Sequence, residues 1–355
     1  MAGGLRHTAA VLADELLAVA RADTGRDDLA YVEPPVRLSG GFFTANHAFR
    51  LDGAPPPWDG PLVVRLFPND APADLARREA VVQRVLAAQG YPAPDIVWWD
   101  DSMRLLERHC FVMRRLPGRP VLGGIKPLEI LPAARKLLTS LVETTASAQA
   151  SLHRLDAAPI VAALEGLPLG VERWLDRLAD FDGHARGLEW LRAHRPADPE
   201  RVVLCHGDLH PGNILADGGH MTGVLDYTVA TVAEPALDVG FTTMSFDLTP
   251  IDAPAPIRRL AARFGQSIAR RYVRAYAAAT GADLTNQRYY EALRCASELT
   301  NVVSYRLARA NGEEYDAPRP TWDAIVPEMV EYFRARTGVS LQIPPVVERD
   351  RARGR

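Results

Sequence analysis

The sequence predicts an α+β protein of two parts, a small antiparallel sheet carrying one main helix and a larger, mostly helical part. Short strand-like runs dominate residues 1–115, whereas helical periodicity dominates residues 116–355. Pro117-Gly118 and Gly123-Gly124 mark a connector between the two parts. The length of 355 residues also fits two domains, at about 150 residues for each.

Residues 1–115 are expected to form the smaller domain. An amphipathic helix over residues 8–22 comes first. A second helix is expected over Pro72–Gln89, because proline stands near its first turn and Gly90 follows its end. Strand-like runs lie on both sides of this helix in the sequence, at Val32–Leu38, His47–Leu51, Leu62–Phe67, Ile96–Trp99 and Cys110–Arg114.

Residues 116–355 are expected to form the larger, helical domain. Its predicted helices lie near Pro132–His153, Val171–Leu178, Pro235–Phe246, Pro256–Thr280, Gln287–Ala310 and Trp322–Arg336. A β-like insert interrupts them, with short runs at Arg201–Cys205, Ile214–Ala216 and Thr222–Asp226. Loops held by a rigid scaffold often carry function, so this insert is the first place to look for chemistry.

Composition excludes several classes of protein. A formal net charge of −3 without a basic block argues against nucleic acid as a partner. The sequence contains no run of about 18 apolar residues, so no membrane span is expected. The N-terminus does not resemble a signal peptide. The three cysteines are widely separated, which is typical of buried thiols in a reducing compartment. We therefore expect a cytoplasmic protein, and its oligomeric state cannot be read from the sequence.

The β-like insert contains a dense group of polar residues. It reads His-Gly-Asp-Leu-His-Pro-Gly-Asn over residues 206–213, and a second apolar run then ends near Asp226. Asp208 and Asn213 lie five residues apart across a Pro-Gly turn, so both can point into one cavity. A carboxylate that interrupts an apolar run is costly unless it is paired or binds a cation. Such oxygen ligands suit Mg²⁺, and phosphoryl transfer requires this combination.

These residues resemble the aminoglycoside phosphotransferase/choline kinase-like family, whose fold is similar to that of protein kinases. The His-Gly-Asp-x-His-x-x-Asn loop of that family is complete in residues 206–213, and Asp226 matches its metal-binding aspartate. The resemblance implies a two-lobed protein kinase-like fold with ATP and Mg²⁺ as cofactors. It implies Asp208 as the catalytic base and Asn213 and Asp226 as metal ligands. Asp238 and His153 also match the family and would be structural.

The resemblance predicts a nucleotide site in the first domain. Ser39, Gly40 and Gly41 would form a loop over the phosphates, since glycines let backbone amides approach phosphate oxygens. A simple hairpin turn is the alternative for this loop. Met113 and Leu116 would contact adenine in the segment that connects the lobes, although a methionine on a strand is more often plain core.

Arg65 and Glu79 are expected to form a buried ion pair in this nucleotide site. Arg65 stands on the third strand, where kinases usually carry lysine. Glu79 shares one helix face with apolar residues, so its carboxylate needs a buried partner. The alternatives are an outward-facing arginine and a surface ion pair. Only two of the 41 basic residues are lysines, so arginine at position 65 is weak evidence for lost activity.

The favoured interpretation is an ATP-dependent phosphotransferase that acts on a hydroxyl of a small molecule. Two alternatives remain: a nucleotide-binding protein of the same fold without transfer activity and, less favoured, a protein kinase. The acceptor cannot be read from the sequence. Acidic residues of the helical part such as Asp247 and Glu298 would suit a cation, although such residues are more often solvated surface. Arg306 and Arg309 with Tyr305 and Tyr315 would equally suit an anionic or sugar-like molecule. An antibiotic, a metabolite and an acyl carrier all fit.

Overall fold

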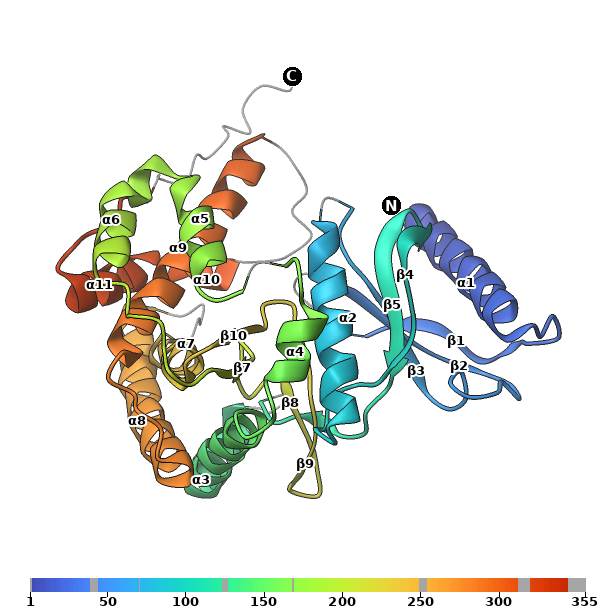
Figure 1. Ribbon diagram of the computed structural model, residues 1–355, viewed down its shortest axis with the longest axis horizontal. Coiled ribbons are helices and arrows are strands. Elements are labelled where there is room, and N and C mark those ends of the chain that lie inside the picture. Colours follow the sequence, from blue (N-terminus) through green and yellow to red (C-terminus); the bar gives the residue numbers. More distant parts are fainter. Residues whose placement is uncertain are drawn as a thin grey trace. The chain divides into compact units, whose positions relative to one another are not determined.

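The computed structural model divides the chain into two compact units (Figure 1). Unit 1 comprises Met1–Pro120, Ala162–Leu167 and Leu215–Val229, and unit 2 comprises Val121–Val161, Pro168–Ile214 and Ala230–Arg355. The structure describes residues 2–38, 44–69, 71–122, 127–167, 169–248, 254–311 and 320–343. Part of the β-like insert, at residues 215–229, thus belongs to unit 1 although it lies far from the other strands in sequence.

A five-stranded antiparallel sheet forms the centre of unit 1. Its strands stand in the order β1 (Tyr31–Arg37), β2 (Ala45–Leu51), β3 (Leu62–Leu66), β5 (Arg108–Arg114) and β4 (Ile96–Leu105). β3 is the central strand and is buried along its whole length, as expected for an apolar run with neighbours on both sides. Its register sets Arg65 opposite Asn46 on β2 and Phe111 on β5.

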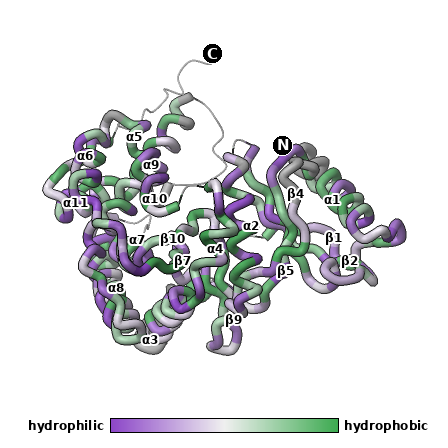
Figure 2. Tube along the Cα trace, in the orientation of Figure 1, coloured by the Kyte–Doolittle hydropathy of each residue, from purple (hydrophilic) through white to green (hydrophobic). Residues whose placement is uncertain are grey.

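Two helices pack on opposite faces of this sheet (Figure 1). Helix α1 (Ala2–Thr24) covers one face through Leu12 and Leu16, and α2 (Ala73–Ala88) covers the other face through Ala76 and Ala80. Both apolar and polar residues occur along each helix (Figure 2), as expected for amphipathic helices that turn one apolar face to a sheet. The sheet therefore carries α1 as a second helix besides the main helix α2.

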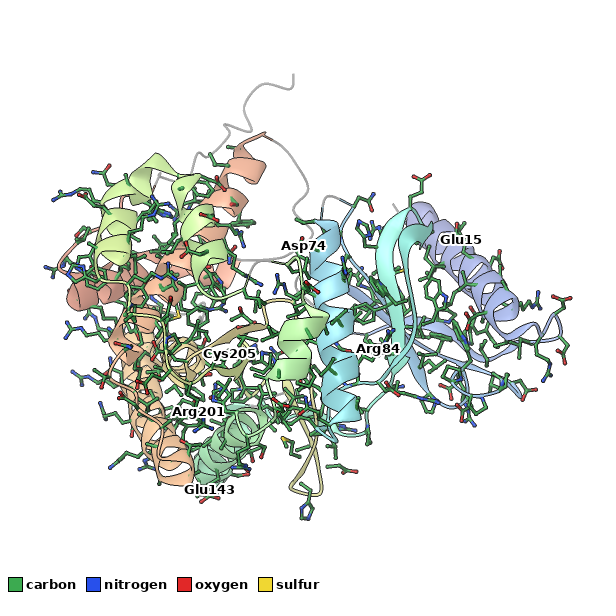
Figure 3. The ribbon with its side chains drawn as sticks, in the orientation of Figure 1. Glu15, Asp74, Arg84, Glu143, Arg201 and Cys205 are labelled. Atoms are coloured by element: carbon green, nitrogen blue, oxygen red, sulfur yellow. The ribbon has the colours of Figure 1, made fainter. Side chains whose placement is uncertain are left out.

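Helix α1 is also attached to the hairpin between β4 and β5. Leu106 and Glu107 at this turn have positive φ angles of 51° and 53°, the conformation that tight hairpin turns require. Figure 3 labels Glu15 on α1. The Leu106 amide donates a hydrogen bond of 2.6 Å to Glu15 Oε2. This bond satisfies a backbone donor that the turn itself leaves unpaired.

A second small sheet in unit 1 joins the connector to the β-like insert. Its order is β6 (Arg119–Pro120), β8 (Ile214–Asp217) and β9 (His220–Val224). Gly118 has φ +96°, and a Cβ at this position would lie 2.7 Å from the carbonyl oxygen of Ala216. A Cβ at Gly223 would lie 2.4 Å from Leu116 Cδ1. Both glycines are needed because the connector lies directly against β8 and β9.

Unit 2 is built around a buried helix, α7 (Pro235–Asp247). Nearly every side chain of α7 is buried, the pattern of a helix in the middle of a domain. It packs against α8 (Ala255–Thr280) and α9 (Gln287–Asn311). The other described helices of unit 2 are α3 (Pro127–Leu152), α5 (Glu172–Ala179), α6 (Ala185–Ala193), α10 (Pro320–Ala324) and α11 (Val326–Thr337). The residues of α4 (Ala158–Ala163) are divided between the two units.

Several predicted elements differ from the observed ones. The single helix expected over residues 322–336 is interrupted at Ile325, which separates α10 from α11. The strand expected to end at Asp226 ends at Val224. Helix α6 was not predicted, and neither was β10 (Thr231–Ala233), which pairs with β7 (Val203–Cys205). Among the residues described, none of the helices combines the length and apolar character needed to cross a membrane.

His184 makes stability of unit 2 depend on pH. Its ring is 1% exposed, and within the described chain Nε2 has no hydrogen-bond partner. Burial lowers the pKa of His184 to about 4, so the unfolded chain binds this proton first as the pH falls below about 6.5. We expect the free energy of unfolding to fall between pH 6.5 and 4, by up to roughly 3 kcal/mol from this residue.

Urea unfolding of the wild type and of His184→Gln across this pH range tests the expectation. The difference in free energy of unfolding between the two proteins should change with pH over that window. His220→Gln is the control, because His220 is exposed on β9. A difference that is independent of pH for His184→Gln would contradict the assignment.

Candidate active site

The loop of residues 206–213 follows β7 in unit 2 and is held by its own hydrogen bonds. The Asp208 amide donates to His206 Nδ1 at 3.2 Å, and the Gly212 amide donates to His210 Nδ1 at 3.1 Å. Asn213 Nδ2 donates to the carbonyl oxygen of Asp208 at 3.0 Å. Both histidines thus act as local acceptors that shape the loop. The Asn213 amide group is fixed through its nitrogen, which leaves its oxygen as the atom to offer a cation.

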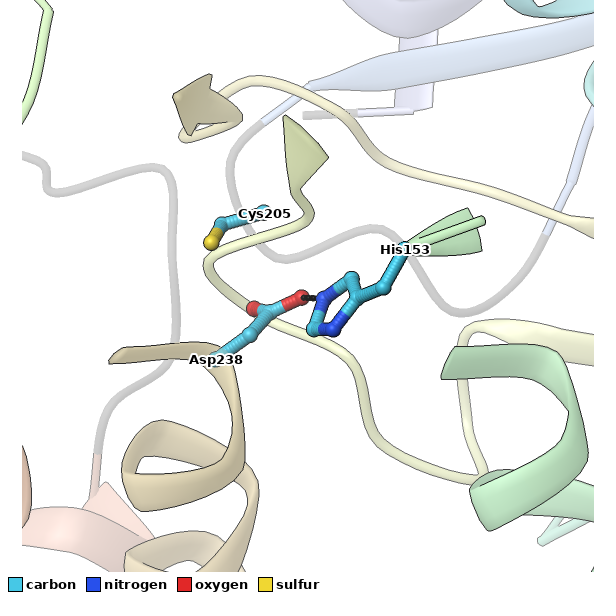
Figure 4. Close-up of side chains that lie close together, drawn as sticks. All are labelled: His153, Cys205 and Asp238. Carbon is cyan, nitrogen blue, oxygen red and sulfur yellow. Dashed lines mark hydrogen bonds and ion pairs between the residues drawn. The ribbon is translucent and has the colours of Figure 1, made fainter. Parts of the chain in front are cut away.

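Asp238 on α7 fixes the beginning of this loop through hydrogen bonds to its backbone amides. Its Oδ2 accepts the His206 amide at 2.8 Å, and its Oδ1 accepts the Gly207 amide at 2.7 Å. The His153 ring hydrogen-bonds to Oδ2 through Nε2 at 3.0 Å (Figure 4). Its Nδ1 hydrogen-bonds to the Tyr276 hydroxyl at 2.7 Å. Burial alone would raise the pKa of Asp238, but the bond from His153 and the other partners hold it below its usual value.

His153, Cys205 and Asp238 together resemble a metal site, since one ligand atom of each lies within 4.8 Å of the others (Figure 4). The hydrogen bonds argue against this interpretation. Both ring nitrogens of His153 and both oxygens of Asp238 have partners. Cys205 Sγ also has hydrogen-bond acceptors, the carbonyl oxygens of Ala233 and Glu234 at 3.8 and 3.6 Å. The group is a buried hydrogen-bond network, and the structural role expected for His153 and Asp238 agrees with it.

Arg294 on α9 contacts the predicted catalytic base. Its Nη2 donates to Asp208 Oδ1 at 2.6 Å, and its Nη1 donates to the carbonyl oxygen of Gly207 at 3.3 Å. The same Nη2 lies 2.9 Å from Glu298 Oε1. Sequence reasoning missed Arg294. The available signal was a charged pair at i and i+4 on a helix face that is otherwise buried.

Arg65, Glu79 and Asp226 form a second charged group, within unit 1. Arg65 Nε donates to Glu79 Oε2 at 2.9 Å, and Nη2 lies 3.0 Å from Asp226 Oδ1. The expected ion pair of Arg65 and Glu79 is therefore present, and it is buried. Gln83 Nε2 donates to the other oxygen of Glu79 at 3.0 Å. Burial raises the pKa of Glu79 to about 7, although the Arg65 guanidinium opposes that shift.

Asp226 adopts a left-handed backbone conformation, with φ 69°. Aspartate tolerates this region better than most residues, at a cost of about 1–2 kcal/mol. The Thr228 hydroxyl donates to Asp226 Oδ1, the same oxygen that faces Arg65. The turn after β9 thus fixes one oxygen of a side chain that remains 36% exposed.

The other predicted nucleotide residues lie in or near the sheet of unit 1. Met113 on β5 is buried in the apolar cluster beneath α2, and Leu116 packs on Gly223. Ser39, Gly40 and Gly41 lie outside the described residues. The structure brings Arg65, Glu79 and Asp226 together in unit 1 and Asp208 with Asn213 in unit 2.

One buried polar atom in unit 1 is compatible with a ligand. Asn46 Oδ1 is buried and has no hydrogen-bond partner within the described chain, and Asn46 stands opposite Arg65 on the neighbouring strand. Within unit 1 the guanidinium of Arg65 suits a phosphate and the carboxylate of Asp226 suits a hard cation such as Mg²⁺. Within unit 2 the side-chain oxygens of Asp208 and Asn213 are also ligands that suit such a cation.

Phosphotransferases are among the known proteins that this chain resembles. A family described as the phosphotransferase enzyme family matches residues 44–279. The aminoglycoside 3'-phosphotransferase of Streptomyces fradiae is 32% identical over 143 residues, which cover 38% of this chain and 52% of the relative. Acyl-CoA dehydrogenase family member 11 of Gallus gallus is 28% identical over 195 residues, covering 51% of this chain and 24% of the relative. The chain thus spans a quarter to a half of the length of these curated relatives.

Solved structures share the fold at low sequence identity. Macrolide 2'-phosphotransferase MphH from Brachybacterium faecium is 23% identical, with TM-score 0.50, covering 88% of this chain and 98% of that one. A choline/ethanolamine kinase family protein from Mesorhizobium loti is 18% identical, with TM-score 0.55, covering 92% and 100%. Aminoglycoside phosphotransferase APH(4)-Ia with ADP and hygromycin B is 15% identical, with TM-score 0.57, covering 91% and 98%. These matches confirm the predicted kinase-like α+β fold.

Removing the Asp238 carboxylate should strongly destabilise unit 2. Asp238→Ala leaves two buried amides and the His153 ring without their acceptor, which should cost about 3–5 kcal/mol in the free energy of unfolding. Asp238→Asn should cost less, because one acceptor oxygen remains. Urea unfolding measures both values. Asp217→Ala, at an exposed position on β8, is the matched control, and an equal cost for it and Asp238→Ala would contradict the assigned role.

Proposed function

The chain belongs to the phosphotransferase enzyme family, and from this we propose that it transfers the γ-phosphoryl group of ATP to a hydroxyl of a small molecule. The observation that carries the proposal is the loop of residues 206–213, which presents Asp208 and Asn213 on a backbone fixed by Asp238. Catalysis of phosphoryl transfer is mostly positioning and charge stabilisation, and a rigid loop with these side chains supplies both.

Asp208 is proposed as the base that accepts the proton of the attacking hydroxyl. Its Oδ1 is held by Arg294, and among the described residues no hydrogen bond reaches its Oδ2. The side chain is 31% exposed, so an acceptor can approach this second oxygen. A base must lie within hydrogen-bond reach of the proton that it abstracts, and Oδ2 is the atom available for this.

Asn213 and Asp226 are proposed as ligands of Mg²⁺, each through a side-chain oxygen. The cation, when bound, neutralises charge on the β- and γ-phosphates. Arg65 is proposed to bind phosphate, with Glu79 holding its guanidinium in place. Ser39, Gly40 and Gly41 would cover the phosphates, and Met113 and Leu116 would contact adenine, as the family resemblance implies.

The acceptor is proposed to be a small molecule, and its class is left to experiment. The relatives' names suggest aminoglycosides, macrolides, choline or ethanolamine, and an acyl-CoA. Three charged residues that could have selected among these classes are already paired: Asp247 with Arg336, Glu298 with Arg294, and Arg306 with Asp323. Their charges alone therefore do not indicate a cationic or an anionic acceptor.

A screen of these four acceptor classes by ADP release tests the proposed activity. Asp208→Asn should lower kcat by about 10²–10⁴-fold, because a positioned base is lost, while the Kd for Mg·ATP stays close to the wild-type value. Asp217→Asn, an exposed carboxylate on β8, should leave kcat unchanged. ADP release that is the same in the wild type and in Asp208→Asn would overturn the assignment of the base.

Arg65 should control nucleotide binding. Arg65→Ala combined with Glu79→Gln, which avoids an unpaired buried carboxylate, should weaken Mg·ATP binding about 10–100-fold, the value of a hydrogen bond to a charged group. Arg65→Lys should retain part of the affinity, since it keeps the charge but loses the fork. Calorimetric titration measures the Kd, with exposed Arg37→Ala on β1 as control. An unchanged Kd in the double variant would remove Arg65 from the nucleotide site.

A protein of this fold that binds nucleotide without transfer is the second candidate. Arginine in place of the usual lysine on the third strand favours it. Tight binding of Mg·ATP by the wild type, with no ADP release for any acceptor class and none with water, would support this second function over the first.

A further inference from the structure

Arg294 lies between two carboxylates of unequal exposure. Its Nη2 donates to Asp208 Oδ1 at 2.6 Å and also lies 2.9 Å from Glu298 Oε1. The Asp208 side chain is 31% exposed, whereas that of Glu298 is 5% exposed. One carboxylate thus faces solvent at the loop and the other is buried on α9 with the arginine.

The surroundings of Arg294 hold its guanidinium in one orientation. The group stacks over the Phe241 ring at 5.3 Å, and Nη1 donates to the Gly207 carbonyl oxygen at 3.3 Å. A planar guanidinium with several fixed donors constrains a carboxylate more than a single charge does. An aspartate on a loop would otherwise sample several side-chain rotamers.

Unit 1 contains the same arrangement with different residues. Arg65 is buried and lies between Glu79, which is 0% exposed, and Asp226, which is 36% exposed. In both units a buried arginine is neutralised by a buried glutamate and holds one oxygen of a partly exposed aspartate. The parallel indicates that the arginine orients the aspartate, because a purely structural pair would not need the third, exposed group.

We propose that Arg294 is a positioning residue for Asp208 and that Glu298 supplies its permanent counter-charge; this rests on the proposed function. During transfer the acceptor O–H bond breaks and its proton passes to Asp208. The acceptor oxygen forms a bond to the γ-phosphorus as the bond from phosphorus to the β–γ bridging oxygen breaks, and ADP leaves with that electron pair. Asp208 is then neutral, but Arg294 still has Glu298 as a partner, so no buried guanidinium is left uncompensated.

The test separates positioning from stability by removing the charges singly and together. Arg294→Gln removes the positive charge that neutralises the buried Glu298 carboxylate, so this variant should be less stable. Arg294→Gln with Glu298→Gln removes both charges and should recover the melting temperature. If Arg294 positions Asp208, the double variant should still show kcat lowered about 100-fold for Mg·ATP hydrolysis with water as acceptor, the effect of a small misplacement. Its KM for ATP should stay near the wild-type value.

Two further variants sharpen the result. Arg294→Lys should recover part of kcat, because it restores a donor to Asp208 without the fork. Arg259→Ala, at an exposed position on α8, should change neither kcat nor melting temperature. A double variant that recovers wild-type kcat along with its stability would overturn the proposal.

Crystal structures of the wild type and of the double variant keep the proposal testable even without ATP turnover. The Asp208 carboxylate should hold one rotamer against Arg294 in the wild type and several rotamers in the double variant. The same single rotamer in both proteins would overturn the positioning role. Absence of turnover in the wild type, both with water and with every acceptor class, would instead overturn the proposed function and leave this structural outcome readable.

Discussion

The buried carboxylate of Asp238 is the interaction on which the candidate site depends. An ionised group with no exposed surface is strongly destabilising unless every oxygen is satisfied, and here two backbone amides and a histidine ring do this. The amides belong to His206 and Gly207, so the same two hydrogen bonds satisfy the Asp238 carboxylate and fix the start of the loop. The loop cannot move away without exposing a buried charge to an apolar interior, and α7, which carries Asp238, is itself buried on all sides. The rigidity of Asp208 and Asn213 therefore originates in the core of unit 2.

The two charged groups extend this principle from backbone to side chains. Arg65 and Arg294 are each nearly inaccessible, and each has a buried glutamate that keeps the guanidinium neutralised. The aspartates that they hold are the ones left partly exposed. A buried pair of arginine and glutamate contributes little net stability after the cost of desolvation. Its main effect is to orient the guanidinium, and with it the aspartate. Each aspartate has one oxygen fixed by arginine, a geometry that would be lost if the same aspartate were free on the surface.

The sequence predicted those features that depend on local pattern. Strands of alternating or apolar residues, helices with proline at their start and the complete 206–213 loop were identified from neighbours in the chain. The pairing of Arg65 with Glu79 was also predictable, because a carboxylate on an apolar helix face needs a partner. Arg294 was not predictable in this way, since its contact with Asp208 spans 86 residues and depends on how α9 packs. The left-handed conformation of Asp226 and the three-residue strand β10 have no periodicity by which to recognise them.

The scarcity of lysine acquires a physical meaning at position 65. Arg65 uses two different nitrogens, Nε toward Glu79 and Nη2 toward Asp226, at 2.9 and 3.0 Å. A lysine has one ammonium nitrogen and would have to place it between both carboxylates, whereas the planar guanidinium reaches each along its own direction. Arginine at this position is thus well suited to hold a glutamate and an aspartate at once. A compositional bias toward arginine and a functional role for this one arginine are therefore compatible, so the replacement of lysine is only weak evidence for lost activity.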